Sequence, residues 1–232
     1  MSSLSLTAAF ARYGTKLANP QWAVSAINAN GELVGEDDDS AGGSNANLIF
    51  VAPEDATYTI IANTFSADEF GEVAAALATT RVTAIEINLS CPNLEGGGMF
   101  ALDAAAAARV VTTVRKATEL PLGAKLSPNS EDIVAIAAAV AEAGADWVVL
   151  GNTVWGAGFD VETRRPLLSG VVGGYSGRPI KPIALRCVWE VSRSMPDLPI
   201  LGTGGVASGE DVVEFLLAGA SAVGGVRILP RG

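Results

Sequence analysis

From Thr57 onward, short runs of β-forming residues alternate with Ala-rich runs of helical character, and this alternation restricts the fold more than any other feature. The strand candidates are Thr57–Asn63, Val82–Asn88, Leu122–Leu126, Trp147–Asn152, Pro199–Gly202 and Ser221–Val226. Their near-continuous hydrophobicity is typical of strands buried on both faces, as in a parallel sheet. Repeated strand–helix units with right-handed crossovers therefore predict a parallel α/β fold.

Helical runs fill the spaces between these strands. They cover residues 66–79, 103–117, 130–144, 181–194 and 208–219. The first is expected to begin with Ser66 as its N-cap, ahead of acidic residues, and the second carries its basic residues late, where they complement the helix dipole. The third pairs a Ser130 cap with early acids and is expected to stop at Gly144. These runs are too short and too interrupted by charge to span a bilayer.

The first 56 residues lack this alternation. The stretch QWAVSAINANGELVG predicts a hairpin around Asn30-Gly31, and ANLIFVAPEDATYTI predicts a second hairpin through Pro53–Ala56. Between them, EDDDSAGGSNAN has the acidic, Gly- and Ser-rich composition of a linker. We therefore divide the chain into an atypical N-terminal segment, residues 1–56, and a β/α portion, residues 57–232.

Charge and residue usage exclude several classes of function. The net charge is −10 and Lys and Arg form no run, which argues against a nucleic-acid or anionic-membrane partner. The chain has no histidine, so any proton transfer falls to Cys, Asp, Glu, Lys or Tyr. The two cysteines, Cys91 and Cys187, form no metal or disulfide motif, and we expect no metal site. Two thiols and the absence of a signal-peptide pattern in the first twelve residues predict a cytoplasmic protein.

Cys91 is the first candidate for chemistry. It lies in EINLSCPN, between Asn88 and Asn93, at the end of an apolar run. A free thiol has a pKa of about 8.5, so a modest lowering of that pKa by its surroundings makes it a competent base near neutral pH. The neighbouring amides offer both donors and acceptors to a ligand. For an isolated cysteine, however, an inert side chain in a turn built by Asn and Pro92 is the more frequent case.

Other candidates follow later strands. Lys125 lies inside the apolar run LGAKLSP, where a lysine is costly to bury unless it is paired; a salt bridge is the simpler alternative to a ligand contact. Asn152 and Thr153 end a strand, where they can serve as an ordinary cap. The glycine clusters Gly173–Gly177 and Gly202–Val206 let backbone N–H groups approach an anion, although most glycine pairs are simply turns.

Seven ordered motifs between about residues 59 and 223 carry a family resemblance. They are IIANTFSADEF, AIEINLSCPN, KLSPNSEDI, AGADWVVLGNT, DVETRRPLLSG, GGYSGRPIKPIALR and PILGTGGVASGEDVVEFLLAGASAV. In this order they resemble the class 1 dihydroorotate dehydrogenases, most of all the branch that works with an iron–sulfur/FAD partner subunit. The resemblance implies a parallel (β/α)8 TIM-type barrel that contains FMN and oxidises dihydroorotate to orotate in pyrimidine biosynthesis.

The resemblance also assigns roles. Cys91 would be the general base that takes the C5 proton while hydride leaves C6 for the flavin. The implied substrate contacts are Asn88, Asn93, Asn152 and Thr153. The implied FMN contacts are Asn63, Lys125, Gly177, Gly204, Gly205, Gly225 and Arg227. Among these, Lys125 would lie beside N1 of the reduced flavin, the glycines would receive the phosphate, and Arg227 would hold the phosphate bidentately. The partners implied are dihydroorotate, the iron–sulfur/FAD subunit and a second copy in a homodimer.

Two departures from the family pattern leave alternatives open. Residues 1–56 lack the Lys-containing stretch and the Asn-bearing loop with which family members reach flavin and substrate, and Val226 stands at a position of close approach to the phosphate. We therefore expect a barrel that is incomplete or has an atypical N-terminal β segment. The alternative function is a catalytically inactive, truncated or chimeric barrel that folds and binds FMN only. A phosphate-binding isomerase or lyase barrel is a third candidate, which NLSCPN disfavours.

Overall fold

In the computed structural model, residues 66–79, 82–90 and 99–224 are described with their side chains, and five N-terminal strands are described by their backbone. These strands are β1 (Ser3–Ser5), β2 (Val24–Ile27), β3 (Leu33–Asp37), β4 (Ile49–Val51) and β5 (Thr59–Ala62). They form two small antiparallel sheets, one of order β1-β4 and one of order β3-β2-β5.

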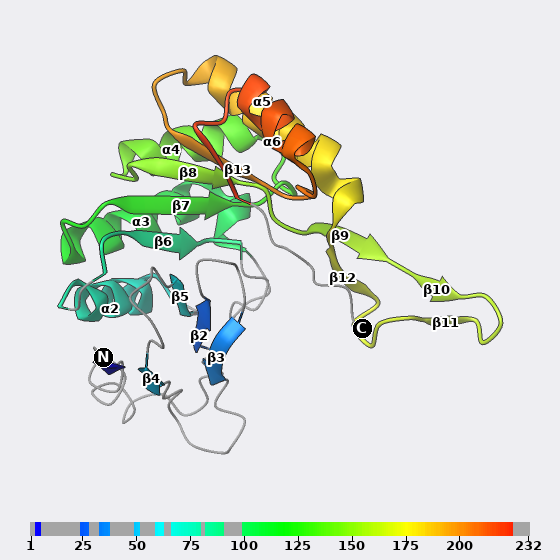
Figure 1. Ribbon diagram of the computed structural model, residues 1–232, viewed down its shortest axis with the longest axis horizontal. Helices are drawn as coiled ribbons and strands as arrows, with labels where there is room; N and C mark the ends of the chain where they lie inside the picture. Colours follow the sequence, from blue (N-terminus) through cyan, green and yellow to red (C-terminus); the bar gives the residue numbers. More distant parts are fainter. Residues whose placement is uncertain are drawn as a thin grey trace.

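A five-stranded parallel sheet forms the centre of the described chain (Figure 1). Its strands are β6 (Ile85–Asn88), β7 (Leu122–Leu126), β8 (Trp147–Leu150), β13 (Ile200–Thr203) and β14 (Ala222–Gly224). The spatial order β14-β13-β8-β7-β6 follows the order of the chain, and every pair is parallel. The parallel α/β fold predicted from the alternation of strands and helices is thus confirmed.

Helices connect the strands and bury one face of this sheet. They are α2 (Ala67–Ala78), α3 (Ala104–Ala117) after the short 3-10 helix η1 (Phe100–Leu102), α4 (Ile133–Glu142), α5 (Lys181–Ser194) after η2 (Arg178–Ile180), and α6 (Gly209–Leu217). Alternate strand residues such as Ile87, Ala124, Leu150 and Ile200 are almost inaccessible to solvent and join one apolar core with the helices. Period-2 alternation in the strands and Ala- and Val-rich helix faces produce this core.

The opposite face of the sheet carries the remaining alternate residues. Register places Glu86 beside Gly123 and Gly123 beside Trp147, and in the next row Asn88 beside Lys125. The Trp147 ring lies over Gly123, where a Cβ would overlap it. This face is therefore partly polar, unlike the helix-covered face, and the polar side chains lie toward the carboxyl ends of the strands.

A long β-ribbon extends away from the sheet between β8 and η2 (Figure 1). It consists of β9 (Val154–Ala157), β10 (Phe159–Asp160), β11 (Arg165–Pro166) and β12 (Val172–Tyr175). Strands β9 and β12 pair antiparallel, and so do β10 and β11. The glycine cluster Gly173–Gly177 was predicted to approach an anion. Gly173 and Gly174 instead pair with strand β9, so Gly177 is the glycine of this cluster that lies at a turn.

Two expectations for the N-terminal strands are wrong. The run Thr57–Asn63 was expected to join the parallel sheet, but β5 pairs antiparallel with β2. The hairpin expected through Pro53–Ala56 is not formed either, because β4 pairs with β1. A short apolar run specifies a strand without specifying its neighbour, and here β2 supplies an edge. The pairing of β2 with β3 agrees with the hairpin predicted around Asn30-Gly31.

The helix starts show one success and one correction. Ser66 caps α2 in a reciprocal capping box with Glu69, as the sequence indicates. Ser130 does not cap α4: its hydroxyl donates to Ser127 O at 3.1 Å, and the Asp132 carboxylate accepts from Ala135 N at 2.9 Å instead. The nearer carboxylate reaches the free N–H groups of the first turn, so the helix begins two residues later. In the part of the chain that the structure describes, no helix is long and apolar enough to cross a membrane.

Candidate functional site

The candidate residues gather at the edge where the parallel strands end. Asn88 ends β6, Lys125 lies one residue before the end of β7, and Asn152 follows β8 by two residues. Because the carboxyl ends of parallel strands meet at one edge, this edge is where α/β folds place their ligands. Asn88, Lys125 and Asn152 are each partly accessible, and Thr153 is exposed.

A hydrogen-bonded chain joins Asn88 to Asn152 through Ser90. Asn152 Nδ2 donates to Ser90 Oγ, and Ser90 Oγ donates to Asn88 Oδ1 at 2.9 Å. Asn152 Oδ1 accepts from Thr153 N at 2.7 Å. Both amide oxygens are thus engaged, and no described residue accepts from Asn88 Nδ2. Side-chain amides can donate to a ligand that is rich in acceptors.

A second pair of side chains braces the segment that follows β8. Asn129 Nδ2 donates to Ser127 Oγ and to Thr153 O, both at 3.0 Å, and Asn129 Oδ1 accepts from Trp155 N at 3.0 Å. Ser127 itself is fully buried. The loop after β7 therefore fixes the backbone on which Asn152 and Thr153 stand.

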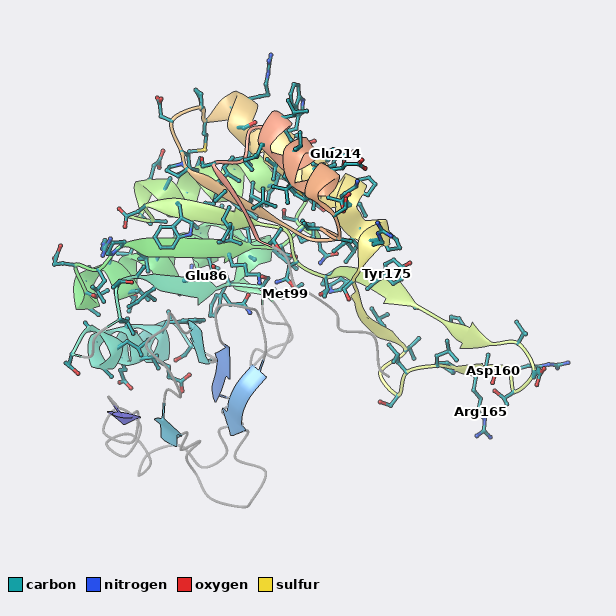
Figure 2. All side chains as sticks on the ribbon, viewed as in Figure 1. Glu86, Met99, Asp160, Arg165, Tyr175 and Glu214 are labelled. Atoms are coloured by element: carbon teal, nitrogen blue, oxygen red, sulfur yellow. The ribbon has the colours of Figure 1, made fainter. Side chains whose placement is uncertain are left out.

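Lys125 and Glu86 place opposite charges on the polar face of the sheet. They occupy diagonal positions of neighbouring strands, because Asn88 pairs with Lys125 and Glu86 pairs with Gly123. Glu86 is an exposed residue (labelled in Figure 2). The protein around its carboxyl group nevertheless raises its pKa by desolvation, and the charge of Lys125 lowers that pKa by a smaller amount. Among the described residues, no carboxylate lies within ion-pair distance of Lys125.

Three glycines from two distant segments form a close-packed turn. Gly177, Gly204 and Gly205 all have positive φ, at 87°, 110° and 76°. A Cβ on Gly205 would lie 2.8 Å from Lys181 N and 3.0 Å from Gly177 O. Only glycine therefore allows the loop after β13 to lie against the start of α5. Prolines in the first turns of η2 and α5 remove two donors, and Ile180 N donates to Gly177 O. The N–H groups of Gly177, Gly204 and Gly205 donate to no described residue, and these are the donors that the turn offers to an anion.

The amide chain and the glycine turn belong to one edge. Gly151 has a φ of 122°, and a Cβ there would collide with Thr203 O. Asn152 follows Gly151 directly, and Gly204 follows Thr203 directly. The close approach of β8 to β13 thus brings Asn152 to the same edge as Gly204.

Five of the predicted site residues lie outside the described residues. They are Asn63, Cys91, Asn93, Gly225 and Arg227. The other cysteine, Cys187, is buried in α5, and burial raises the pKa of its thiol, which makes it a poor nucleophile or base. Within residues 66–79, 82–90 and 99–224 no group of three or more acidic or thiol side chains is placed to hold a metal ion.

The arrangement fits a flat, acceptor-rich ring that carries a phosphate. Lys125 and the amide donors lie along the polar face, and the glycine turn offers its own backbone N–H groups where a Cβ would otherwise lie. Residues 125, 177, 204 and 205 are thus suited to hold FMN, as the resemblance implies. The sequence analysis did not identify Ser90 or Asn129 as site residues. Ser90 lies two residues after Asn88, and Asn129 lies in the loop after β7, and these positions at the ends of strands could have indicated them.

Comparison with known proteins points to one family. The family model described as dihydroorotate dehydrogenase matches residues 46–228. The dihydroorotate dehydrogenase B (NAD(+)) catalytic subunit of Citrifermentans bemidjiense is 51% identical over 158 residues, which are 67% of this chain and 52% of that protein. The subunit of the same name from Shouchella clausii is 49% identical over 158 residues, with the same shares covered. That from Bacteroides thetaiotaomicron is 51% identical over 144 residues, 62% of this chain and 47% of that protein.

The chain spans about half the length of the curated relatives it matches. The matched region nevertheless covers the parallel sheet, the amide chain and the glycine turn. On the strength of that match, this chain belongs to the dihydroorotate dehydrogenase family.

Proposed function

We propose that the chain is the flavin-binding, catalytic part of an oxidoreductase that converts dihydroorotate to orotate in pyrimidine biosynthesis. The observation that carries the proposal is the amide chain Asn88–Ser90–Asn152 beside Lys125, in a member of this family. Dihydroorotate is acceptor-rich, because it carries two ring carbonyl groups and a carboxylate. Donor amides and the Lys125 cation complement it.

The reaction removes two hydrogens from neighbouring carbons. Bound FMN would accept the hydride from C6. Cys91 is proposed to take the C5 proton, which requires a thiolate and therefore a modestly lowered pKa. Asn88 and Asn152, with Asn93 and Thr153, would orient the ring, while Lys125 would stabilise negative charge that develops next to it. Asn63, Gly225 and Arg227 complete the proposed contacts to the cofactor.

The finer fold and the partners belong to the same proposal. The five parallel strands would close with further strands into a (β/α)8 barrel, residues 57–232 forming its FMN-binding portion and residues 1–56 an atypical segment. The support is a sheet whose polar face lies opposite the helices. An iron–sulfur/FAD subunit would receive the electrons, since the relatives are named catalytic subunits of an NAD(+) enzyme. A cytoplasmic location remains the expectation from cysteine usage.

A homodimer is also proposed, with the β-ribbon Val154–Tyr175 as its contact surface. Its exposed apolar side chains include Trp155, Phe159, Val161 and Leu167. Its tip carries two acids and two bases, with Asp160 paired in register with Arg165 (Figure 2). In a chain of net charge −10, a tip of balanced charge is the part that can meet its own copy without repulsion.

One observation favours the alternative of a fold that binds FMN without turnover. Strand β5 pairs with β2 and not with β6, so the described strands leave the β6 edge of the parallel sheet without the neighbour that a closed barrel requires.

An anaerobic titration distinguishes the two functions. We expect purified protein to carry an oxidised-flavin spectrum that bleaches when dihydroorotate is added. Cys91→Ser should slow bleaching near neutral pH by at least about 100-fold, the usual worth of a general base, with partial recovery at high pH. Flavin that never bleaches in the unmodified protein supports the binding-only alternative. An unchanged rate in the variant removes Cys91 from the mechanism.

A further inference from the structure

A carboxylate in α6 ties the glycine turn to the start of α5. Asp211 Oδ1 lies 2.6 Å from Lys181 Nζ, and Lys181 is the first residue of α5. Asp211 Oδ2 accepts from Ala207 N at 2.8 Å, and Ala207 belongs to the loop after β13. The two oxygens of one buried side chain thus hold Lys181 and Ala207, which are 26 residues apart in the sequence.

The same loop contains Gly204 and Gly205. Gly205 packs directly on Lys181 N, and Gly204 packs on Ile180 and Ala184. Ser208, one residue after Ala207, caps α6 by accepting from Asp211 N at 3.2 Å. Asp211 therefore fixes the loop from both its own helix and the neighbouring one, at the place where Gly205 meets Gly177.

Lys181 does not serve as an anion ligand in this arrangement. Its ammonium group also contacts Glu214 at 2.5 Å (Glu214 is labelled in Figure 2), so two carboxylates surround one cation. Hydrogen bonds from Lys181 and Ala207 hold the pKa of Asp211 well below its usual range, and those to Asp211 and Glu214 raise the pKa of Lys181. The group of three carries a net charge of −1, which by itself repels a phosphate.

We propose that Asp211 is a positioning residue for phosphate binding: it clamps the loop Gly204–Ser208 to the start of α5, so that backbone N–H groups of the glycine turn are pre-arranged for the phosphate of the flavin nucleotide. The inference rests on the proposed FMN site. It explains why a negative group is kept next to an anion-binding turn. The geometric benefit of an ordered turn outweighs the electrostatic repulsion, which solvent around the half-exposed Glu214 reduces.

Asp211→Asn and Glu214→Gln make a matched pair for the test. Each removes one negative charge from the same cluster, so electrostatics alone predicts tighter FMN binding for both. We expect Asp211→Asn to bind FMN about 10- to 100-fold more weakly, as the loss of buried charge-assisted hydrogen bonds implies. We expect Glu214→Gln to bind FMN at least as tightly as the unmodified chain. The measurement is quenching of flavin fluorescence by the apo-protein.

Riboflavin, which lacks the phosphate, separates positioning from general damage. The unmodified protein should prefer FMN to riboflavin, and Asp211→Asn should lose that preference while binding riboflavin normally. If Asp211→Asn does not fold, Asp211→Glu takes its place in the test. This variant keeps the charge but displaces the carboxylate, and we expect it to lose the preference for FMN in the same way. If the unmodified protein binds FMN and riboflavin equally tightly, the proposed phosphate site is refuted. A preference that survives in the Asp211 variants refutes the clamp alone.

Discussion

Side chains at the carboxyl ends of the strands form the candidate site through a few direct contacts. Asn88, Ser90 and Asn152 are connected by hydrogen bonds, and Lys125 lies beside Asn88 in register. The sequence identified Asn88, Asn152 and Lys125 as candidates, each with an ordinary structural alternative. It did not identify Ser90 as their link, because the contact with Asn152 spans 62 residues and depends on the strand register.

Glu86 provides a pH test at the residue scale. Burial raises its pKa, so the ionised carboxylate opposes folding once the pH exceeds the pKa of the unfolded chain, about 4.3. We expect Glu86→Gln to raise the thermal midpoint at pH 7. The gain in thermal midpoint should shrink as the pH falls and vanish below about pH 4, where Glu86 is protonated and therefore as neutral as the glutamine that replaces it. Scanning calorimetry of the two proteins across this range checks it, and a gain independent of pH would contradict the explanation.

At the scale of elements, caps and close approaches decide where helices begin and which segments meet. The pattern before α2 correctly indicated Ser66, because a serine followed by Glu69 forms a capping box from local residues alone. Before α4, Ser130 and Asp132 compete for the same role, and local sequence does not rank them. The hydroxyl of Ser130 is instead used by Ser127 O.

The α4 cap yields a stability prediction. Replacing Asp132 with Ala should lower the free energy of unfolding by about 1 kcal/mol, because Ala135 N loses its acceptor. Asp132→Asn, which keeps a capping oxygen, should stay within a few tenths of a kcal/mol. Urea unfolding followed by circular dichroism measures both. If the two variants lose equal stability, charge near the helix dipole, and not the capping hydrogen bond, is the main contribution of Asp132.

For the molecule as a whole, the parallel sheet, the helices on one face and the projecting ribbon set what it can bind. A two-stranded ribbon by itself is marginally stable in water, and this one exposes several large apolar side chains. A second copy that covers the ribbon would remove that surface from solvent.

The proposed dimer predicts a change of mass in solution. The unmodified chain should elute as a dimer, and the double variant Phe159→Ser/Val161→Ser should elute as a monomer at the same concentration. Leu217→Ser removes an equally exposed apolar side chain from α6 and should leave the dimer intact. Multi-angle light scattering gives the masses directly. A ribbon variant that stays dimeric assigns the interface to another surface.

The sequence by itself determined the parallel α/β class, the order of the parallel strands and their helices from residue 66 onward and the family, because periodicity and ordered motifs are local properties of the chain. It did not predict the ribbon strands β9 to β12. Tertiary structure alone decided that β5 pairs with β2, that Gly205 meets Gly177 and that Asp211 holds both Lys181 and Ala207. These choices depend on which backbone edges and polar groups come together in space. A strand edge or a carboxylate accepts several partners that the local sequence does not distinguish.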